Sequence, residues 1–155
     1  MIELEKLQDI DKRYRIFGMI FLLSTKLETM GNTFLGELTT KQWFLMLTLT
    51  NFFETPPTLS QLAKQMGTSH QNTKQLALKL QEKGFLSIEK DDQDNRALRI
   101  VPTEKIEEYV KNRQEKDHKF IEDFFGGLTE AEVEDLDKIL LKMLDNIEYL
   151  EEKLA

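Results

Sequence analysis

The sequence contains no cysteine, and this absence excludes disulfide bonds, thiol nucleophiles and cysteine-based redox sensing. Proline and glycine are scarce, with three and seven residues among 155, so long helices can run without interruption. No apolar run is long enough to cross a bilayer, and the first ten residues lack the apolar block of a signal peptide. We therefore expect one mainly helical domain that works in the cytoplasm, away from membranes.

Positively charged residues are also fewer than negatively charged ones. The chain has 21 lysines and arginines and 28 aspartates and glutamates, which gives a net charge of −7. The deficit is uneven: residues 1–57 carry a net charge of −1, residues 58–105 carry +2 and residues 106–155 carry −8. An acidic protein is a poor general binder of polyanions, but a mildly basic middle can orient it on one. Charged helices also serve solubility alone, so this asymmetry needs support from motifs.

Two helices are predicted in the first third of the chain. Apolar residues at spacings of three and four run over residues 4–30, and the Gly-Asn pair at 31–32 is expected to end this helix. Thr39 and Gln42 then have the spacing of a capping box. The helix that follows is apolar on nearly every side and is therefore expected to be buried, until the prolines of ETPPT stop it.

The next segment repeats the capping signature twice. Threonine and glutamine stand three residues apart at 58 and 61 and again at 68 and 71, and each pair is predicted to open a helix. Gly67 and Gly84 are expected to end these helices. Two helices joined by a tight turn that contains glycine form the helix-turn-helix pattern, which many plain helical hairpins share.

A β-hairpin is predicted directly after this pattern. FLSIEK and ALRIV are short segments with alternating apolar residues, and DDQDN between them has the composition of a turn. A helix-turn-helix followed by a hairpin is much more specific than either part and predicts a winged helix. Pro102 stands at the end of the second strand, where its missing N–H costs little.

Helical periodicity resumes after the hairpin. Thr103 can cap a helix that runs to about Phe125, two glycines break it, and Thr129 with Glu132 opens another helix that continues to the end. The apolar stripes of the first and last helices are too long for the small middle domain to cover, so they call for a partner chain. We predict a mainly α fold with a small β-hairpin wing. Its winged helix-turn-helix spans 39–103, and helical dimerisation regions span 1–38 and 104–155.

Three segments resemble signatures of the MarR family of bacterial transcriptional regulators. LTTKQWFLML is similar to the start of the family's second helix, and LAKQMGTSHQNTKQLALKLQEKGFL is similar to its helix-turn-helix. DNRALRIVPTEK is similar to the wing signature DxRxxxVxLTxxG. The resemblance covers essentially the whole chain. Two positions depart from it, because Pro102 replaces the usual leucine and Ile106 stands where glycine is common.

The resemblance implies a homodimer that binds a pseudo-palindromic operator in double-stranded DNA and releases it when a small aromatic or phenolic effector binds. The leading hypothesis is thus a transcriptional regulator, a repressor of nearby genes that a ligand relieves, with neither enzymatic activity nor a cofactor. No catalytic Ser-His-Asp order or glycine-rich phosphate loop stands against this. The alternative is a helical protein-interaction module on a winged-helix scaffold without DNA binding, which the overall acidity favours.

The predicted DNA contacts of the helix-turn-helix gather on its second helix. The core side of that helix is assigned to Thr73, Leu76, Ala77 and Leu80. Polar side chains crowd the other side of the N-terminal half, which enters the major groove first: Ser69, His70, Gln71, Lys74 and Gln75. Gln71 could pair with adenine, although the predicted cap competes for its amide. Without the hairpin beside them, these residues would simply be solvated.

The resemblance makes Arg96 the wing residue that enters the minor groove, where narrow A·T stretches concentrate negative potential. Asp94 lies two residues earlier, and we expect its carboxylate to hold the guanidinium group of Arg96. Asp91 and Asp92 are expected to serve the turn and to point away from phosphate. A hairpin tip made soluble by charge would explain the aspartates equally well. The remaining predicted phosphate contacts are Lys90 and Arg99 at the strand ends.

Two further candidate sites depend on helical spacing alone. Glu115, His118 and Glu122 share one helix face and could hold a divalent metal, but a solvated helix explains them better and we predict no metal site. An effector pocket is expected between the long helices and the winged core. Its candidate lining, which could equally be plain core, consists of Phe17, Phe21, Trp43 and Met46.

Overall fold

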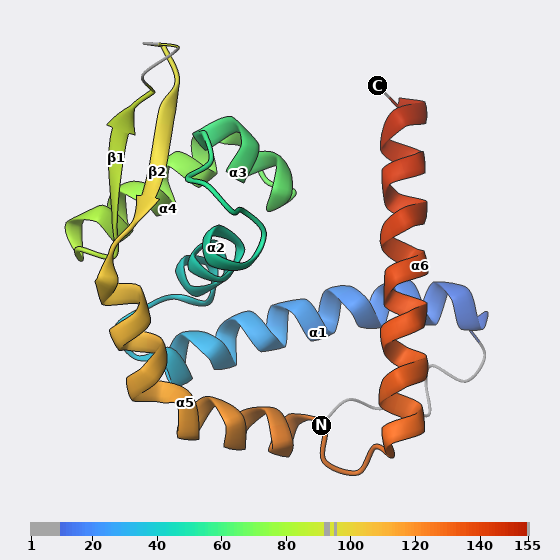
Figure 1. Ribbon diagram of the computed structural model, residues 1–155. Coiled ribbons are helices and arrows are strands. Elements are labelled where there is room, and N and C mark those ends of the chain that lie inside the picture. The colour runs from blue at the N-terminus through green and yellow to red at the C-terminus, as the bar shows by residue number, and fades with distance from the viewer. Residues whose placement is uncertain (1–9, 92–93, 95, 155) are drawn as a thin grey trace. The chain divides into compact units, whose positions relative to one another are not determined.

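The computed structural model describes residues 10–91, 94 and 96–154. In chain order the elements are α1 (Lys12–Leu35), α2 (Thr40–Asn51), α3 (Leu59–Gln65), α4 (His70–Glu82), β1 (Leu86–Lys90), β2 (Leu98–Pro102), α5 (Glu104–Phe124) and α6 (Glu130–Leu154) (Figure 1). The predicted order of helices and hairpin is confirmed. The chain divides into two compact units, Met1–Glu108 and Tyr109–Ala155, and α5 passes from the first to the second. The predicted boundaries at 38 and 104 concern dimerisation and stay a prediction.

Helix α1 begins and ends later than its apolar spacing predicted. Asp11 caps it, because Asp11 Oδ1 accepts a 2.8 Å hydrogen bond from the backbone N–H of Arg13, and Ile10 lies outside the helix. A helix running unbroken over residues 4–30 is therefore wrong, and positions 4–9 of that prediction lie outside the described residues. The helix continues through residues 31–32 to Leu35, where Gly36 with a φ of 69° ends it.

Gly31 serves close packing instead of ending the helix. A Cβ atom at this position would lie 2.4 Å from the Oγ1 atom of Thr40. The Thr40 hydroxyl donates a 2.9 Å hydrogen bond to the carbonyl of Glu28, and the Thr40 N–H donates a 2.7 Å bond to Asn32 Oδ1. The start of α2 therefore lies directly against the last turns of α1, and only a residue without a Cβ permits this approach.

Helix α2 has the predicted capping box. The Thr39 N–H donates to Gln42 Oε1 at 3.1 Å, and the Gln42 N–H donates to Thr39 Oγ1 at 3.2 Å. The expected burial of this helix holds for one side, where Leu45, Met46 and Leu49 are buried, whereas Phe44 and Leu47 are 42% and 37% exposed. The small winged core covers one side of α2 only.

Helices α3 and α4 form the predicted helix-turn-helix, with one correction at the cap of α4. The cap residue is Ser69, whose Oγ accepts a 3.2 Å hydrogen bond from the N–H of Asn72, so the predicted pairing of Thr68 with Gln71 is wrong. Thr68 is already used to close α3, because its N–H donates to the Ala63 carbonyl at 3.1 Å across Gly67, which has a φ of 62°. Helix α4 can therefore begin only one residue later.

Strands β1 and β2 form the predicted antiparallel hairpin, with Ile88 opposite Ile100, and it extends away from α2 (Figure 1). The second strand is also tied to the loop between α2 and α3. The Ile100 N–H donates to the Pro57 carbonyl at 2.9 Å, and Arg99 forms an isolated β-bridge with Thr58. The core under the hairpin consists of fully buried side chains, which include Leu62, Leu80, Phe85 and Ile100.

The second unit holds the rest of α5 and helix α6. The fourth predicted capping pair is confirmed, because the Thr129 N–H donates to Glu132 Oε2 at 2.8 Å and the Glu132 N–H donates to Thr129 Oγ1 at 3.3 Å. The hydrogen bond from the Thr129 backbone, followed by the bond from its hydroxyl, lowers the pKa of the Glu132 carboxyl below its usual value of 4.5. In the described part of the chain, no helix has the length and hydrophobicity that crossing a membrane requires.

Candidate nucleic-acid interface

Helix α4 has the two faces that its sequence predicted. Thr73, Ala77 and Leu80 are buried against the core, whereas Leu76 is only half-buried. The polar side of its N-terminal half is open to solvent, with Lys74 partly covered and four exposed residues: Ser69, His70, Gln71 and Gln75. An exposed polar row on the first two turns of a helix is the arrangement that a major groove can accept.

The corrected cap changes what the N-terminal turn of α4 can offer. Because Ser69 caps the helix through Asn72, the side-chain amide of Gln71 is not needed for a capping box and can contact a base edge. The Ser69 hydroxyl oxygen accepts from Asn72 and keeps its own proton for donation to a phosphate. The positive end of the α4 dipole favours the same anion.

The carboxylate of Asp94 binds a different group of Arg96 from the one predicted. Asp94 Oδ1 accepts a 2.9 Å hydrogen bond from the backbone N–H of Arg96, so the expected contact with the guanidinium group is wrong. The Asp94 carbonyl also accepts from the Ala97 N–H at 2.8 Å, which closes the turn. The guanidinium of Arg96 is exposed and makes no hydrogen bond or ion pair with another described residue. Asp94 therefore fixes the backbone that carries Arg96 and leaves its side chain available.

Asp91 and Arg99 form an ion pair that the sequence analysis missed. Asp91 was expected to point outward at the turn, but it is buried, and its Oδ2 accepts a hydrogen bond from Arg99 Nε. Arg99 Nη1 donates a 2.6 Å bond to the carbonyl of Pro56. Asp91 Oδ1 accepts from the Asp94 N–H at 2.8 Å, so the pair joins the turn to the loop before α3. Asp92, which was also expected to point outward at the turn, lies outside the described residues.

This ion pair changes the interpretation of the predicted phosphate contacts at the strand ends. Arg99 already uses Nε and Nη1 inside the protein, whereas Lys90 is exposed on β1. The sequence does not distinguish Asp91 from the neighbouring aspartates. Asp91 meets Arg99 only because of the hairpin register and the position of the α2–α3 loop. Of the predicted cationic contacts, Lys90 and Arg96 are exposed, and Lys74 on α4 is partly covered.

The spacing that suggested a metal site does not assemble one. His118 Nε2 lies 3.2 Å from Glu122 Oε1, and Glu115 does not complete a set with them. In the described ranges, no three His, Asp or Glu side chains converge in a way that could hold a metal ion.

The four residues expected around an effector lie in different surroundings. Phe17 and Phe21 are 63% and 61% exposed on α1, with their rings in an edge-to-face arrangement 5.1 Å apart. Met46 is buried and Trp43 is half-buried on α2. Their role in a pocket stays a prediction.

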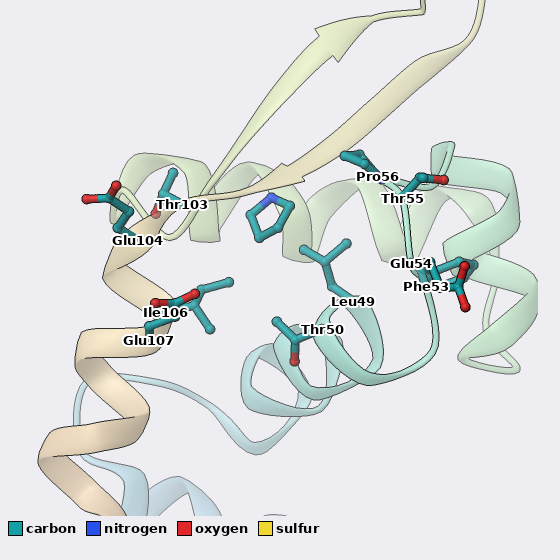
Figure 2. A pocket seen from close by; sticks show the side chains of 11 residues that line it. Leu49, Thr50, Phe53, Glu54, Thr55, Pro56, Thr103, Glu104, Ile106 and Glu107 are labelled. Carbon is teal, nitrogen blue, oxygen red and sulfur yellow. The ribbon is translucent and has the colours of Figure 1, made fainter.

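A different pocket, of about 360 Å³, opens where β2 meets α5 (Figure 2). We call it the junction pocket, and none of the four expected residues belongs to it. Helix α2, the loop after it and the first turn of α5 supply its walls. Its lining consists of Leu49, Thr50, Phe53, Glu54, Thr55, Pro56, Pro102, Thr103, Glu104, Ile106 and Glu107.

Comparison with known proteins relates this chain to solved structures, although no family model matches its sequence. A MarR protein from Peptoclostridium difficile has a TM-score of 0.80 and 24% identity, over 96% of this chain and 95% of that one. The Staphylococcus aureus MepR–DNA complex has a TM-score of 0.72 and 21% identity, over 89% and 99%. Bordetella bronchiseptica BpsR, whose DNA binding is regulated by 6-hydroxynicotinic acid, has a TM-score of 0.64 and 18% identity, over 81% and 98%. The chain therefore has the winged-helix fold of the MarR transcriptional regulators.

Proposed function

We propose that this protein is a homodimeric, DNA-binding transcriptional regulator of the MarR family, which represses nearby genes until a small ligand releases it. The observation that carries the proposal is the exposed polar row on α4 beside a hairpin whose Arg96 is exposed, in a fold that MepR uses on DNA. Cytoplasmic action and the absence of an enzymatic role belong to the same proposal.

The proposed roles on DNA follow from side-chain chemistry. His70, Gln71 and Gln75 are exposed on α4, and we assign them to base edges of the major groove, where Gln71 offers the paired donor and acceptor that adenine requires. Ser69, Lys74 and Lys90 supply phosphate contacts, which set position without reading sequence. Arg96 enters the minor groove, where its charge gains most from narrow A·T stretches.

The proposed dimer has a physical reason in the exposed apolar helices. Side chains on α6 such as Leu144, Ile147 and Leu150 are 57%, 50% and 54% exposed in the single chain. Continuous apolar faces of this kind are uncommon on monomers. A twofold dimer would present two copies of α4 about 34 Å apart, which matches successive major grooves of one duplex. A ligand that prefers another spacing would shift the population away from DNA.

The first experiment selects binding sites from a random duplex library and then titrates the recovered sequence by fluorescence anisotropy at two salt concentrations. We expect a pseudo-palindrome with half-sites about 10 base pairs apart and affinity that falls steeply with salt. Arg96→Ala should weaken binding by about fivefold or more, because one well-placed contact is worth roughly 1–3 kcal/mol. Lys111→Ala removes the same charge from an exposed position on α5 and should have little effect.

Two variants of α4 separate base reading from phosphate contact. Gln71→Ala should weaken binding to the selected site and relax the preference at one base pair, with the salt dependence unchanged. Lys74→Ala should weaken binding to every duplex and reduce the salt slope by about one. If no sequence is enriched, and binding ignores both salt and Arg96, the interaction module without DNA binding would replace this proposal.

A further inference from the structure

We infer that Lys83, at the C-terminal end of α4, is a positioning residue that holds this helix at a fixed orientation to the end of α1. In a dimer, that orientation sets which spacing of two half-sites the protein accepts. The positioning role stands on contacts within one chain, whereas its consequence for half-site spacing rests on the proposed function.

The side chain of Lys83 reaches the segment that connects α1 to α2. Its Nζ donates a hydrogen bond to the carbonyl of Glu37, which is 46 residues away in the chain, and donates to Gln42 Oε1 at 3.3 Å. Glu37 directly follows Gly36, the residue that ends α1. Gln42 is buried and belongs to the capping box that opens α2. One ammonium group therefore joins the end of α4 to the short connection after the first long helix.

The backbone of the same turn is bonded to the start of α5. Lys105 Nζ donates a 2.8 Å hydrogen bond to the Lys83 carbonyl and lies 4.5 Å from the centre of the Phe85 ring. The Thr103 hydroxyl donates to the Gly84 carbonyl at 2.7 Å, and the Thr103 N–H donates to the Phe85 carbonyl at 3.0 Å. The C-terminal end of α4 is therefore fastened both to the end of α1 and to the start of α5. We call this set of contacts around Lys83 the α4 joint.

Ordinary helix capping explains only part of the α4 joint. A lysine in the last turn of a helix is favoured by the helix dipole without any specific contact, and Lys79 of α4 has this role while exposed. Lys83 is half-buried instead, and its ammonium group binds two neutral oxygen atoms of residues that are distant along the chain. Ordering this long side chain costs conformational entropy that the dipole alone does not require. The contacts are those of a link between elements.

The consequence for DNA follows from the place of the joint on α4. The residues assigned to DNA lie on the N-terminal half, from Ser69 to Gln75, and Lys83 follows the last residue of the same 13-residue helix. Because a helix turns as one body, fixing its C-terminal end fixes the direction of its N-terminal half. A small rotation at the joint of each protomer would change the distance between two copies of α4 on one duplex. Without the ammonium group of Lys83, the protein should accept spacings that the wild type rejects.

The first test measures the α4 joint without DNA. Because the chain has no cysteine, spin labels can be attached to two introduced cysteines, Thr33→Cys in the last turn of α1 and Gln75→Cys on α4, both at exposed positions. Dilution with an excess of unlabelled chain makes double electron–electron resonance report the distance within one chain. Lys83→Met should widen the distance distribution by about 1.5-fold or more, because the apolar stem stays while the hydrogen-bond donors are lost.

Three further variants control this measurement. Lys79→Met removes the same charge from the last turn of α4 and should leave the width unchanged. Lys83→Arg keeps a cation with N–H donors and should restore the wild-type width. Lys83→Gln, whose shorter side chain does not reach the Glu37 carbonyl, should behave like Lys83→Met and replaces it if the methionine variant does not fold. A folded Lys83→Met or Lys83→Gln protein with the wild-type width would overturn the positioning role.

The second test applies the same single variants, without labels, to DNA. Fluorescence anisotropy compares the selected duplex with the same duplex after insertion of one base pair at its centre, which separates the half-sites by about 3.4 Å and rotates them by about 35°. The ratio of the two affinities is the spacing penalty. Lys83→Met should reduce this penalty about threefold or more, because a joint without the ammonium group bends at lower cost. Lys79→Met should leave it unchanged, because the loss of any phosphate contact weakens both duplexes alike.

The salt dependence of binding separates positioning from direct contact with DNA. Lys83→Met should leave the slope of log affinity against log salt unchanged, because Lys83 Nζ is bonded within the protein. A slope reduced by about one would identify Lys83 as a phosphate contact and overturn its positioning role. An unchanged spacing penalty in Lys83→Met would overturn the link to half-site spacing. A wild type that binds no duplex would refute the proposed function, and the distance measurement without DNA would still decide the positioning role.

Discussion

A single buried carboxylate, Asp91, decides how the wing is attached. Its side chain is 5% exposed, it pairs with Arg99, and through Asp94 it reaches the backbone of Arg96. A sequence-based interpretation places it among interchangeable turn aspartates. Its partner lies eight residues away and the carbonyl of Pro56 lies 43 residues from Arg99, so no local pattern marks this cluster.

Asp91→Asn should destabilise the protein by about 1–3 kcal/mol, because it leaves a partly buried guanidinium without its counter-charge. Water screens part of this loss, because the side chain of Arg99 is 38% exposed. Chemical denaturation measures the change in the free energy of unfolding. Asp145→Asn, at an exposed position on α6, should change it little, and equal effects from the two variants would contradict the role of the ion pair.

Packing between elements can reverse what intrinsic propensity favours, as the two glycines of α1 illustrate. Gly18 has no heavy atom within 4 Å of a Cβ placed on it, whereas Gly31 faces Thr40 Oγ1 at 2.4 Å. Both lie inside the same helix, so a difference between them reports on the contact between α1 and α2.

Gly18→Ala should stabilise the protein by about 0.5–1 kcal/mol, because alanine loses less backbone entropy in a helix. Gly31→Ala should destabilise it by about 1–3 kcal/mol, because the new methyl group forces the start of α2 away. Thermal or chemical unfolding at equal protein concentration measures the change in the free energy of unfolding for each variant. A shift in the same direction for both would show that the close approach of α2 is not required.

The cap of α6 gives a prediction about pH. Hydrogen bonds from Thr129 lower the pKa of Glu132 in the folded state below 4.5, so the ionised carboxylate is favoured by folding. The stabilisation is therefore fully present above the unfolded-state value and is lost as the pH falls through the lowered value. Glu132→Gln should be less stable than the wild type at pH 7, and the difference should shrink as the pH falls below 4.5. A stability difference between wild type and variant that grows as the pH falls would contradict the lowered pKa of Glu132.

At the scale of the whole molecule, the exposed apolar faces are the basis of the proposed dimer. Ile147 lies on the long stripe of α6 and is 50% exposed, whereas Lys142 of the same helix is exposed and polar. Ile147→Glu should convert a dimer into a monomer, because a charge would be buried at the interface without a partner. Lys142→Gln makes the same change in net charge and should leave the dimer intact.

Analytical ultracentrifugation gives the oligomeric state of both variants, and anisotropy on the selected duplex gives their DNA affinity. Loss of the dimer with full retention of DNA affinity would contradict the two-half-site geometry. A wild-type chain that sediments as a monomer at micromolar concentration would contradict the dimer directly.

Much of the fold could be predicted because its signals are local. The boxes at Thr39, Thr58 and Thr129 and the glycine end of α4 each depend on residues within one or two turns. The failed box at Thr68 shows the limit of this reasoning. The same residue could serve the end of α3 or the start of α4, and the tight turn allows only the first.

The amino-acid order by itself therefore determined the helices, the hairpin and the polar face of α4, because periodicity and capping act over a few residues. Tertiary structure alone decided the Asp91–Arg99 pair, the need for Gly31 and the junction pocket, because each joins segments that are distant along the chain. Burial and close approach are properties of the folded molecule, and a local pattern of residue types does not encode which distant atom a side chain will meet.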